Sequence, residues 1–102
     1  MFSRNKEEIK NMTSEKLYLI GDKDGKIITA IESEIINNAL EQEKDGIKPH
    51  FAWWDYKNQR PIGNKGWLVW SNVNRGCGVV YRRNDGKMVI VTGMQGDFAY
   101  MA

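Results

Sequence analysis

The pattern of apolar and polar positions near the start of the chain, two apolar β-rich runs separated by a polar turn cluster, predicts a β-hairpin. Residues 16–21 (KLYLIG) and 26–31 (KIITAI) are β-rich runs, and the turn cluster 22–25 (DKDG) separates them. The final glycine of this cluster can adopt the positive φ that a tight reversal requires. Two aspartates in the turn suggest a calcium loop, but apolar Ile27 and Ile28 stand where further oxygen ligands would be needed. We therefore expect a hairpin.

The pattern then changes to the period of a helix over residues 30–44. Apolar residues recur there at three- and four-residue spacing, and acidic and amide side chains fill the opposite face. Thr29 and Glu32 have the spacing of a capping box. Gly46 suits a left-handed helix end, and Pro49 prevents continuation. We expect an amphipathic helix that packs one face on a sheet.

The rest of the chain has the pattern of β-strands. Strand-like runs occupy residues 65–71, 77–83 and 87–92, followed by a short final strand at 98–101. The pair Asp85 and Gly86 predicts a tight hairpin between the second and third runs. Residues 71–76 are expected to form a looser turn.

Together these elements predict an α+β fold, in which an antiparallel, curved β-sheet of five to six strands packs against one amphipathic helix. The approximate order is (α)-β-β-α-β-β-β-(β). A length of 102 residues indicates a single domain, 1–102, with one core. Residues 1–14 contain few apolar anchors, so we expect a short helix or a frayed N-terminus there.

An aromatic stretch from His50 to Trp70 (HFAWWDYKNQRPIGNKGWLVW) occupies the middle of the chain. It contains all four tryptophans, six of the eleven aromatic residues and the only histidine. A turn is expected at Pro61–Gly63, because proline and glycine commonly mark reversals. The part from Phe51 to Arg60 is interpreted as an aromatic loop or irregular strand that is free to meet a partner.

The tryptophans of this stretch are expected to divide between core and surface. Strand alternation places Trp67 and Trp70 on opposite faces, so the strand is apolar on both sides and should be covered on both, by other elements or by a second subunit. An aromatic ring buries ~150–250 Å², so at least two tryptophans belong to the core. Of the adjacent Trp53 and Trp54, we expect one inside and its neighbour partly exposed.

Composition limits the class of protein. Hydrophobic residues make up 41% of the chain and charged residues 27%, as in ordinary globular proteins. No apolar run approaches the ~20 residues that cross a bilayer, so we expect a cytoplasmic protein with no membrane partner. One cysteine and one histidine exclude an internal disulfide framework and a Cys/His zinc site. We expect no metal and no cofactor.

The net charge of +2 hides a difference between the two halves of the chain. Residues 1–48 carry eight Lys and Arg against ten Asp and Glu, whereas residues 49–102 carry seven against three, so the halves have charges of −2 and +4. The aromatic half is therefore the basic half. This favours an anionic partner or the acidic half of a second copy, although an imbalance of this size is also common on solvated surfaces.

Candidate catalytic groups have no evident partners in the sequence. His50 could act as a general acid or base only if folding brought Asp55 or Asp97 beside it. Cys77 is interpreted as a small core residue rather than a nucleophile. Gly76–Gly78 leads into a strand and not into a helix, so it does not predict a phosphate loop. We therefore expect that the protein is not an enzyme. The remote alternative is a small hydrolase or nuclease that uses His50 or Asp55.

Aromatic and basic residues are interleaved in the second half of the chain and form the predicted binding surface. These residues are Phe51, Trp53, Trp54, Tyr56, Lys57, Arg60, Lys65, Arg75, Arg82 and Arg83. Because Trp, Tyr and Arg anchor protein interfaces, the first hypothesis is a small non-enzymatic binding protein, such as an inhibitor or a mobile-element or phage accessory protein. It would bind a protein partner or form a homo-oligomer. The alternative is a nucleic-acid or nucleotide binder, because rings stack on bases while Lys and Arg contact phosphates.

Overall fold

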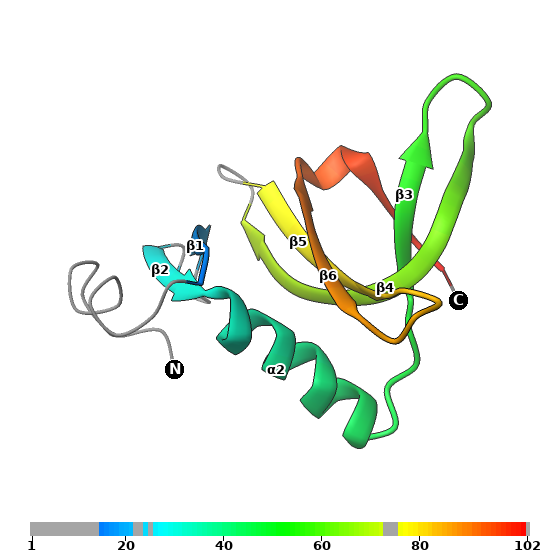
Figure 1. Ribbon diagram of the computed structural model, residues 1–102. Coiled ribbons are helices and arrows are strands. Elements are labelled where there is room, and N and C mark those ends of the chain that lie inside the picture. The colour runs from blue at the N-terminus through cyan, green and yellow to red at the C-terminus, as the bar shows by residue number, and fades with distance from the viewer. Residues whose placement is uncertain (1–14, 22–23, 25, 73–75, 102) are drawn as a thin grey trace.

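The computed structural model describes residues 15–21, 24, 26–72 and 76–101. The elements are β1 (Leu17–Gly21), β2 (Ile27–Ile31), α2 (Glu32–Lys44), β3 (Phe51–Asp55), β4 (Arg60–Asn72), β5 (Gly76–Arg82), β6 (Met88–Gly93), the 3-10 helix η1 (Gln95–Asp97) and β7 (Phe98–Tyr100) (Figure 1). They confirm the predicted α+β class. The first two strands form a hairpin with a sheet of its own, and the other five form one antiparallel sheet.

Two of the sequence predictions fall on residues that are not described. The predicted helix or frayed terminus at residues 1–14 lies outside the described residues, and so does the centre of the predicted turn at 71–76. The strands on either side of that turn are longer than predicted, since β4 continues to Asn72 and β5 begins at Gly76.

The five-stranded sheet is strongly curled. Its strand order is β6-β5-β4-β3-β7, so β3 and β6 are separated by two strands and would lie about 14 Å apart in a flat sheet. The ring of Trp53 on β3 nevertheless lies against Gly93 at the end of β6, 3.1 Å from the position of an added Cβ. The sheet therefore folds over on itself, as Figure 1 shows, and has a concave and a convex face.

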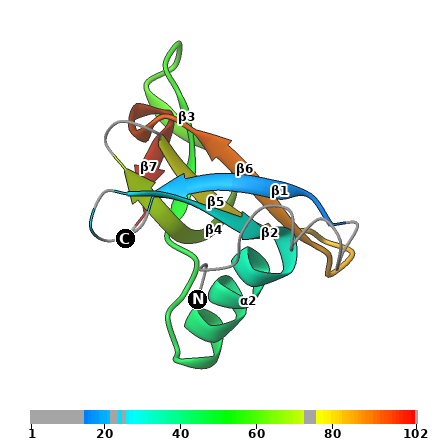
Figure 2. The same cartoon turned by 90° about the vertical axis from the view of Figure 1, so that its left-hand side faces the viewer.

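The convex face of the sheet is covered by α2 and the β1–β2 hairpin. Figure 2 shows the hairpin crossing the sheet, with the helix beside it. The buried residues of this cluster are Ile20, Ala30, Ile35, Ala39, Trp67, Trp70 and Val80. Trp67 and Trp70 confirm that at least two tryptophans are core residues. Burying one such ring contributes up to about 5 kcal/mol to folding, so this layer is a main source of stability.

A second apolar cluster fills the concave face. Cys77, Val79 and Phe98 are buried there, with Phe51, Leu68, Tyr81 and Val91 packed against them. The interpretation of Cys77 as a small core residue is thus confirmed. Since β4 contributes Trp67 to one cluster and Leu68 to the other, the prediction that this strand is covered on both faces is also confirmed.

The start of α2 differs from the prediction, and its end agrees with it. The predicted capping box is wrong, because Thr29 lies in β2, which stays extended and paired with β1 as far as Ile31. The helix begins only at Glu32, whose backbone N–H donates to the carbonyl of Lys16. At the other end Gly46 has φ +85°, as predicted.

The first part of the aromatic stretch is an irregular strand, which confirms one of the two predicted alternatives. Phe51–Asp55 pairs with β4 on one side, with a register shift between Phe51 and Trp53, and with β7 on the other, so it is not a free aromatic loop. The predicted turn at Pro61–Gly63 is wrong, because these residues belong to the 13-residue strand β4. The chain reverses instead at Tyr56–Gln59.

A β-bulge in β4 changes which tryptophans share a face. From Leu68 to Trp70 the strand advances by two residues while its partner β5 advances by one, so Val69 is an extra residue. Trp67 and Trp70 therefore lie in the same cluster, which corrects the expectation that they occupy opposite faces. The ring of Trp70 covers Gly78, where an added Cβ would lie only 2.1 Å from it.

In the described part of the chain, no helix is long and apolar enough to cross a membrane.

Candidate binding surfaces

The aromatic residues of β3 point to different environments. Phe51 is half-buried in the concave cluster. Trp53 packs edge-on against Phe98, with ring centroids 5.1 Å apart, yet 36% of it is exposed. Trp54 is half-buried and follows Trp53 on the strand, so it projects toward the opposite face. Neither member of this pair is fully inside, so the expectation that one of them is a core residue is wrong.

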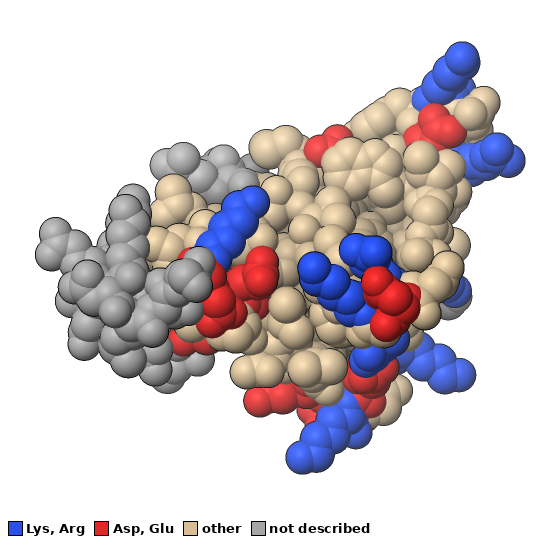
Figure 3. All heavy atoms as spheres, viewed as in Figure 1, with Lys and Arg blue, Asp and Glu red and all other residues tan. Residues whose placement is uncertain are grey.

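The predicted basic residues are spread over three places. Lys57 and Arg60 are exposed at the tip of the β3–β4 hairpin, where Figure 3 shows blue side chains at the upper right. Arg83 pairs with Asp85 at 3.1 Å in the β5–β6 turn. Lys65 and Arg82 line a groove that also includes Glu43 of α2. Arg75 lies outside the described residues.

A small pocket opens at the rim of the concave face. We call it the inner pocket; it has a volume of about 300 Å³ and is lined by Trp53, Ile62, Gly63, Asn64, Tyr81 and Val91. Trp53 and Ile62 are paired residues of β3 and β4, and both are partly exposed, at 36% and 42%. Beyond them Tyr56 donates a hydrogen bond from its hydroxyl to the carbonyl of Gly96, which ties the hairpin to η1.

The hydroxyl of Tyr81, one of the residues of the inner pocket, is buried and makes no hydrogen bond of normal geometry within the described part of the chain. Burial raises the pKa of Tyr81 above its ordinary value, and the backbone of Trp53 offsets only part of this rise. Such a group costs free energy unless a partner is supplied.

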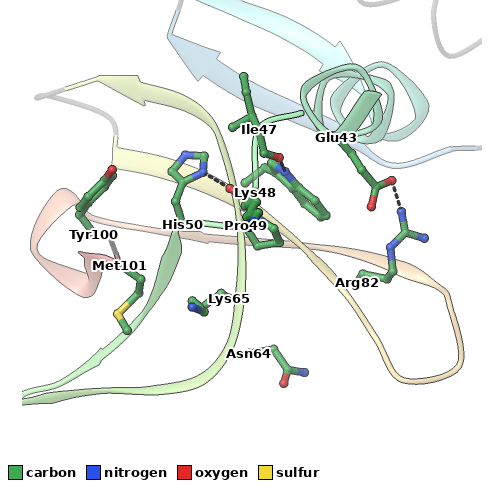
Figure 4. A pocket seen from close by; sticks show the side chains of 11 residues that line it. Glu43, Ile47, Lys48, Pro49, His50, Asn64, Lys65, Arg82, Tyr100 and Met101 are labelled. Atoms are coloured by element: carbon green, nitrogen blue, oxygen red, sulfur yellow. Dashed lines mark hydrogen bonds and ion pairs between the residues drawn. The ribbon is translucent and has the colours of Figure 1, made fainter. Parts of the chain in front are cut away.

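A larger groove lies where the end of α2 meets the sheet. We call it the basic groove; it has a volume of about 800 Å³ and is lined by Glu43, Ile47, Lys48, Pro49, His50, Asn64, Lys65, Trp67, Arg82, Tyr100 and Met101. In the view of Figure 4, His50 and Tyr100 lie at one end, Arg82 and Glu43 at the other, and Lys65 between them.

The floor of the basic groove is fixed by hydrogen bonds to the α2–β3 loop. The indole Nε1 of Trp67 donates to the carbonyl of Ile47 at 2.7 Å. The imidazole Nδ1 of His50 lies 2.8 Å from the carbonyl of Lys48, which assigns the proton to Nδ1 and leaves Nε2 as an acceptor in the neutral ring. These contacts hold the loop across the sheet.

The charge in the basic groove is predominantly positive. Arg82 bonds to Glu43 through Nη2 at 2.5 Å. Lys48 and Lys65 form no ion pair with any residue that the structure describes. One of the three cations is therefore neutralised and two are available to an anionic ligand.

The candidate catalytic groups are not brought together. The carboxylate of Asp55 accepts hydrogen bonds within the β3–β4 turn, where the Asn58 side chain is the main cause of its lowered pKa. Asp97 accepts from the backbone N–H of Met94. Neither makes a hydrogen bond to His50, and Cys77 lies 3.5 Å from the Ser71 hydroxyl. No group of three or more metal-binding side chains occurs among the described residues.

Several residues of the two surfaces were absent from the sequence-based candidates. Lys48 and Tyr100 in the basic groove, and Ile62 and Val91 in the inner pocket, come from segments far apart in the chain. Tyr100 reaches the groove because β7 pairs with β3 and places it opposite Phe51. No local pattern signals this pairing.

No protein-family model matches this chain, and no curated protein or solved structure matches it.

Proposed function

We propose that this chain is a non-enzymatic binding protein that holds an apolar side chain of a protein partner in the inner pocket. The observation that carries the proposal is the pairing of Trp53 and Ile62, two partly exposed apolar residues, at the mouth of a pocket of about 300 Å³. A volume of this size is at the lower end of those that hold ligands, and it suits one side chain.

The rigidity of the pocket supports this use. Trp53 is fixed by its edge-on contact with Phe98 and by its packing against Gly93. Its strand is bonded on both sides, by β4 and by β7. A tryptophan already held in its binding position loses little conformational freedom on association, and tryptophan is among the residues that most often dominate interface energies.

The charges beside the pocket suggest the chemistry of the partner. Lys57 and Arg60 are exposed at the hairpin tip. In the β3–β4 register Arg60 lies opposite Asp55, two residues beyond the Trp53–Ile62 pair. A partner segment with Asp or Glu beside its apolar anchor would complement them.

Proteins of this kind include inhibitors, immunity proteins and accessory proteins of phages or mobile elements, which act by contact alone. We place the chain in the cytoplasm, since its free thiol at Cys77 is buried in the core and is compatible with a reducing compartment.

Selection of random peptides on the immobilised protein tests the proposal. We expect the enriched peptides to share one large apolar residue flanked by Asp or Glu. Trp53→Ala should weaken their binding at least about 30-fold, because truncating a central interface tryptophan costs ~2 kcal/mol or more. Trp54→Ala is the matched control and should leave binding within about threefold of the wild type.

Two outcomes would contradict the proposal: enrichment of no common motif, or equal losses with Trp53→Ala and Trp54→Ala. Sedimentation equilibrium of the wild type and Trp53→Ala identifies the partner further. A dimer that dissociates in the variant would show that a second copy supplies the anchor.

A further inference from the structure

We propose that the basic groove binds single-stranded nucleic acid, through residues that, apart from Asn64, do not line the inner pocket. This second activity does not depend on the proposed protein partner. Asn64 is the one residue that lines both surfaces among those described, so the two sites are adjacent but chemically different.

The cations of the groove come from three separate elements. Lys48 lies on the α2–β3 loop, Lys65 on β4 and Arg82 on β5. The first two form no ion pair with other described residues, and Arg82 uses only Nη2 to bond Glu43, which leaves further N–H donors on its guanidinium. Cations spaced along a groove in this way can follow a phosphate backbone.

Tyr100 supplies a stacking platform at one end of the groove. Its side chain is 69% exposed, the most exposed large hydrophobic residue described. Its ring nevertheless has a defined place, because it contacts the rings of Phe51 and His50 at centroid distances of 5.6 and 6.1 Å. An exposed ring held by its neighbours and set beside cations is the arrangement on which unpaired bases stack.

The polar groups of the groove can contact base edges. With its proton on Nδ1, neutral His50 presents Nε2 as an acceptor, and Asn64 presents both a donor and an acceptor. Stacking on Tyr100 needs a base that is not paired within a duplex, so the ligand is a single strand. The carboxylate of Glu43 is already neutralised by Arg82 and does not oppose the backbone strongly.

Fluorescence anisotropy with a labelled oligonucleotide of about 12 nucleotides tests the proposal. Two phosphate contacts, by Lys48 and Lys65, predict that log K falls with log salt with a slope of about −1.4, at about 0.7 for each contact with a single strand. The double variant Lys48→Ala/Lys65→Ala should bring the slope close to zero and weaken binding at low salt. Lys57→Ala/Lys87→Ala removes the same charge outside the groove and should keep the wild-type slope.

The stacking contact has its own test. Tyr100→Ala should weaken binding roughly 5- to 150-fold without changing the salt slope, because base–aromatic stacking is independent of counterion release. Tyr100→Phe keeps the ring and should bind within about threefold of the wild type. Circular dichroism of each variant confirms that it is folded.

Four results would overturn the proposal. The first is an absence of oligonucleotide binding at the lowest salt, and the second is equal affinity for the matching duplex. The third is competition by polyglutamate as strong as that by unlabelled oligonucleotide. The fourth is an equal loss of oligonucleotide affinity in the two double-lysine variants. Competition by polyglutamate would assign the groove to an acidic polypeptide. Trp53→Ala should leave oligonucleotide binding unchanged, so failure here and failure of the inner-pocket proposal are distinguishable.

Discussion

At the scale of single residues, the buried hydroxyl of Tyr81 lowers the stability of the folded protein. It makes no hydrogen bond of normal geometry with a described residue, the backbone of Trp53 being its nearest polar partner, and it belongs to a side chain that lines the inner pocket. Tyr81→Phe removes this group and keeps the ring, so it should raise the free energy of unfolding by about 1 kcal/mol. Urea denaturation measures the change. A loss of stability instead would show that the hydroxyl is hydrogen-bonded in solution.

The pH dependence of stability provides a second check on the same residue. Because burial raises its pKa above 10.0, folded Tyr81 keeps its proton at pH values where the unfolded chain loses it. The preference of the folded state for protonated Tyr81 contributes fully to the free energy of unfolding below about pH 10, and this contribution is lost as the pH rises through the pKa of the folded state. The unfolding free energy should therefore fall less steeply above about pH 10 in Tyr81→Phe than in the wild type. Burial and the charge of Glu32 also raise the pKa of Tyr18, but Tyr18 is present in both proteins and does not contribute to the difference between them.

At the scale of elements, the end of α2 depends on one backbone conformation. The N–H of Gly46 donates to the carbonyl of Glu43, and that of Ile47 donates to the carbonyl of Gln42, which closes the helix in a Schellman motif. Gly46 has φ +85° and nothing within 4 Å of an added Cβ, so substitution there changes conformation and not packing. Gly46→Ala should cost about 1 kcal/mol in unfolding free energy, measured by urea denaturation.

The control for this helix end is Gly46→Asn. Asparagine tolerates the left-handed region better than alanine, so this variant should be the more stable of the two. Equal stability of the alanine and wild-type proteins would mean that the helix end does not need positive φ in solution.

The elements that local patterns predicted correctly are those with a local cause. The amphipathic period of α2, the left-handed Gly46 and the turn glycine Gly86, with φ +89°, depend on residues adjacent in sequence. The predictions that were wrong depend on pairing between distant segments. Thr29 is in a strand because β2 pairs with β1, and Pro61 is in a strand because it faces Trp54. Pairing partners override local turn and cap preferences.

The same limit applies to the binding surfaces at the scale of the whole molecule. The sequence identified Trp53, Lys65 and Arg82 as candidates, yet the structure puts the first in one surface and the other two in another. Tyr100 joins the basic groove because β7 pairs with β3, and Lys48 joins it on the α2–β3 loop, which the hydrogen bond from Trp67 to the carbonyl of Ile47 holds in place. The number of charged and aromatic residues can be counted in the sequence, whereas which of them share a surface depends on the topology of the fold.

The whole molecule should unfold as one cooperative unit, although its strands form two sheets. Ile20 of β1 is 1% exposed and shares its cluster with Trp67 and Trp70 of the larger sheet. Ile20→Ala should therefore lower the unfolding free energy by about 2–5 kcal/mol, and tryptophan fluorescence and far-UV circular dichroism should shift together in urea. Leu19→Ala, at a neighbouring position that is 64% exposed, should change it by less than about 0.5 kcal/mol. Separate transitions by the two probes would show instead that the hairpin is an independent unit, and that the layer over the convex face is not needed to hold the curled sheet.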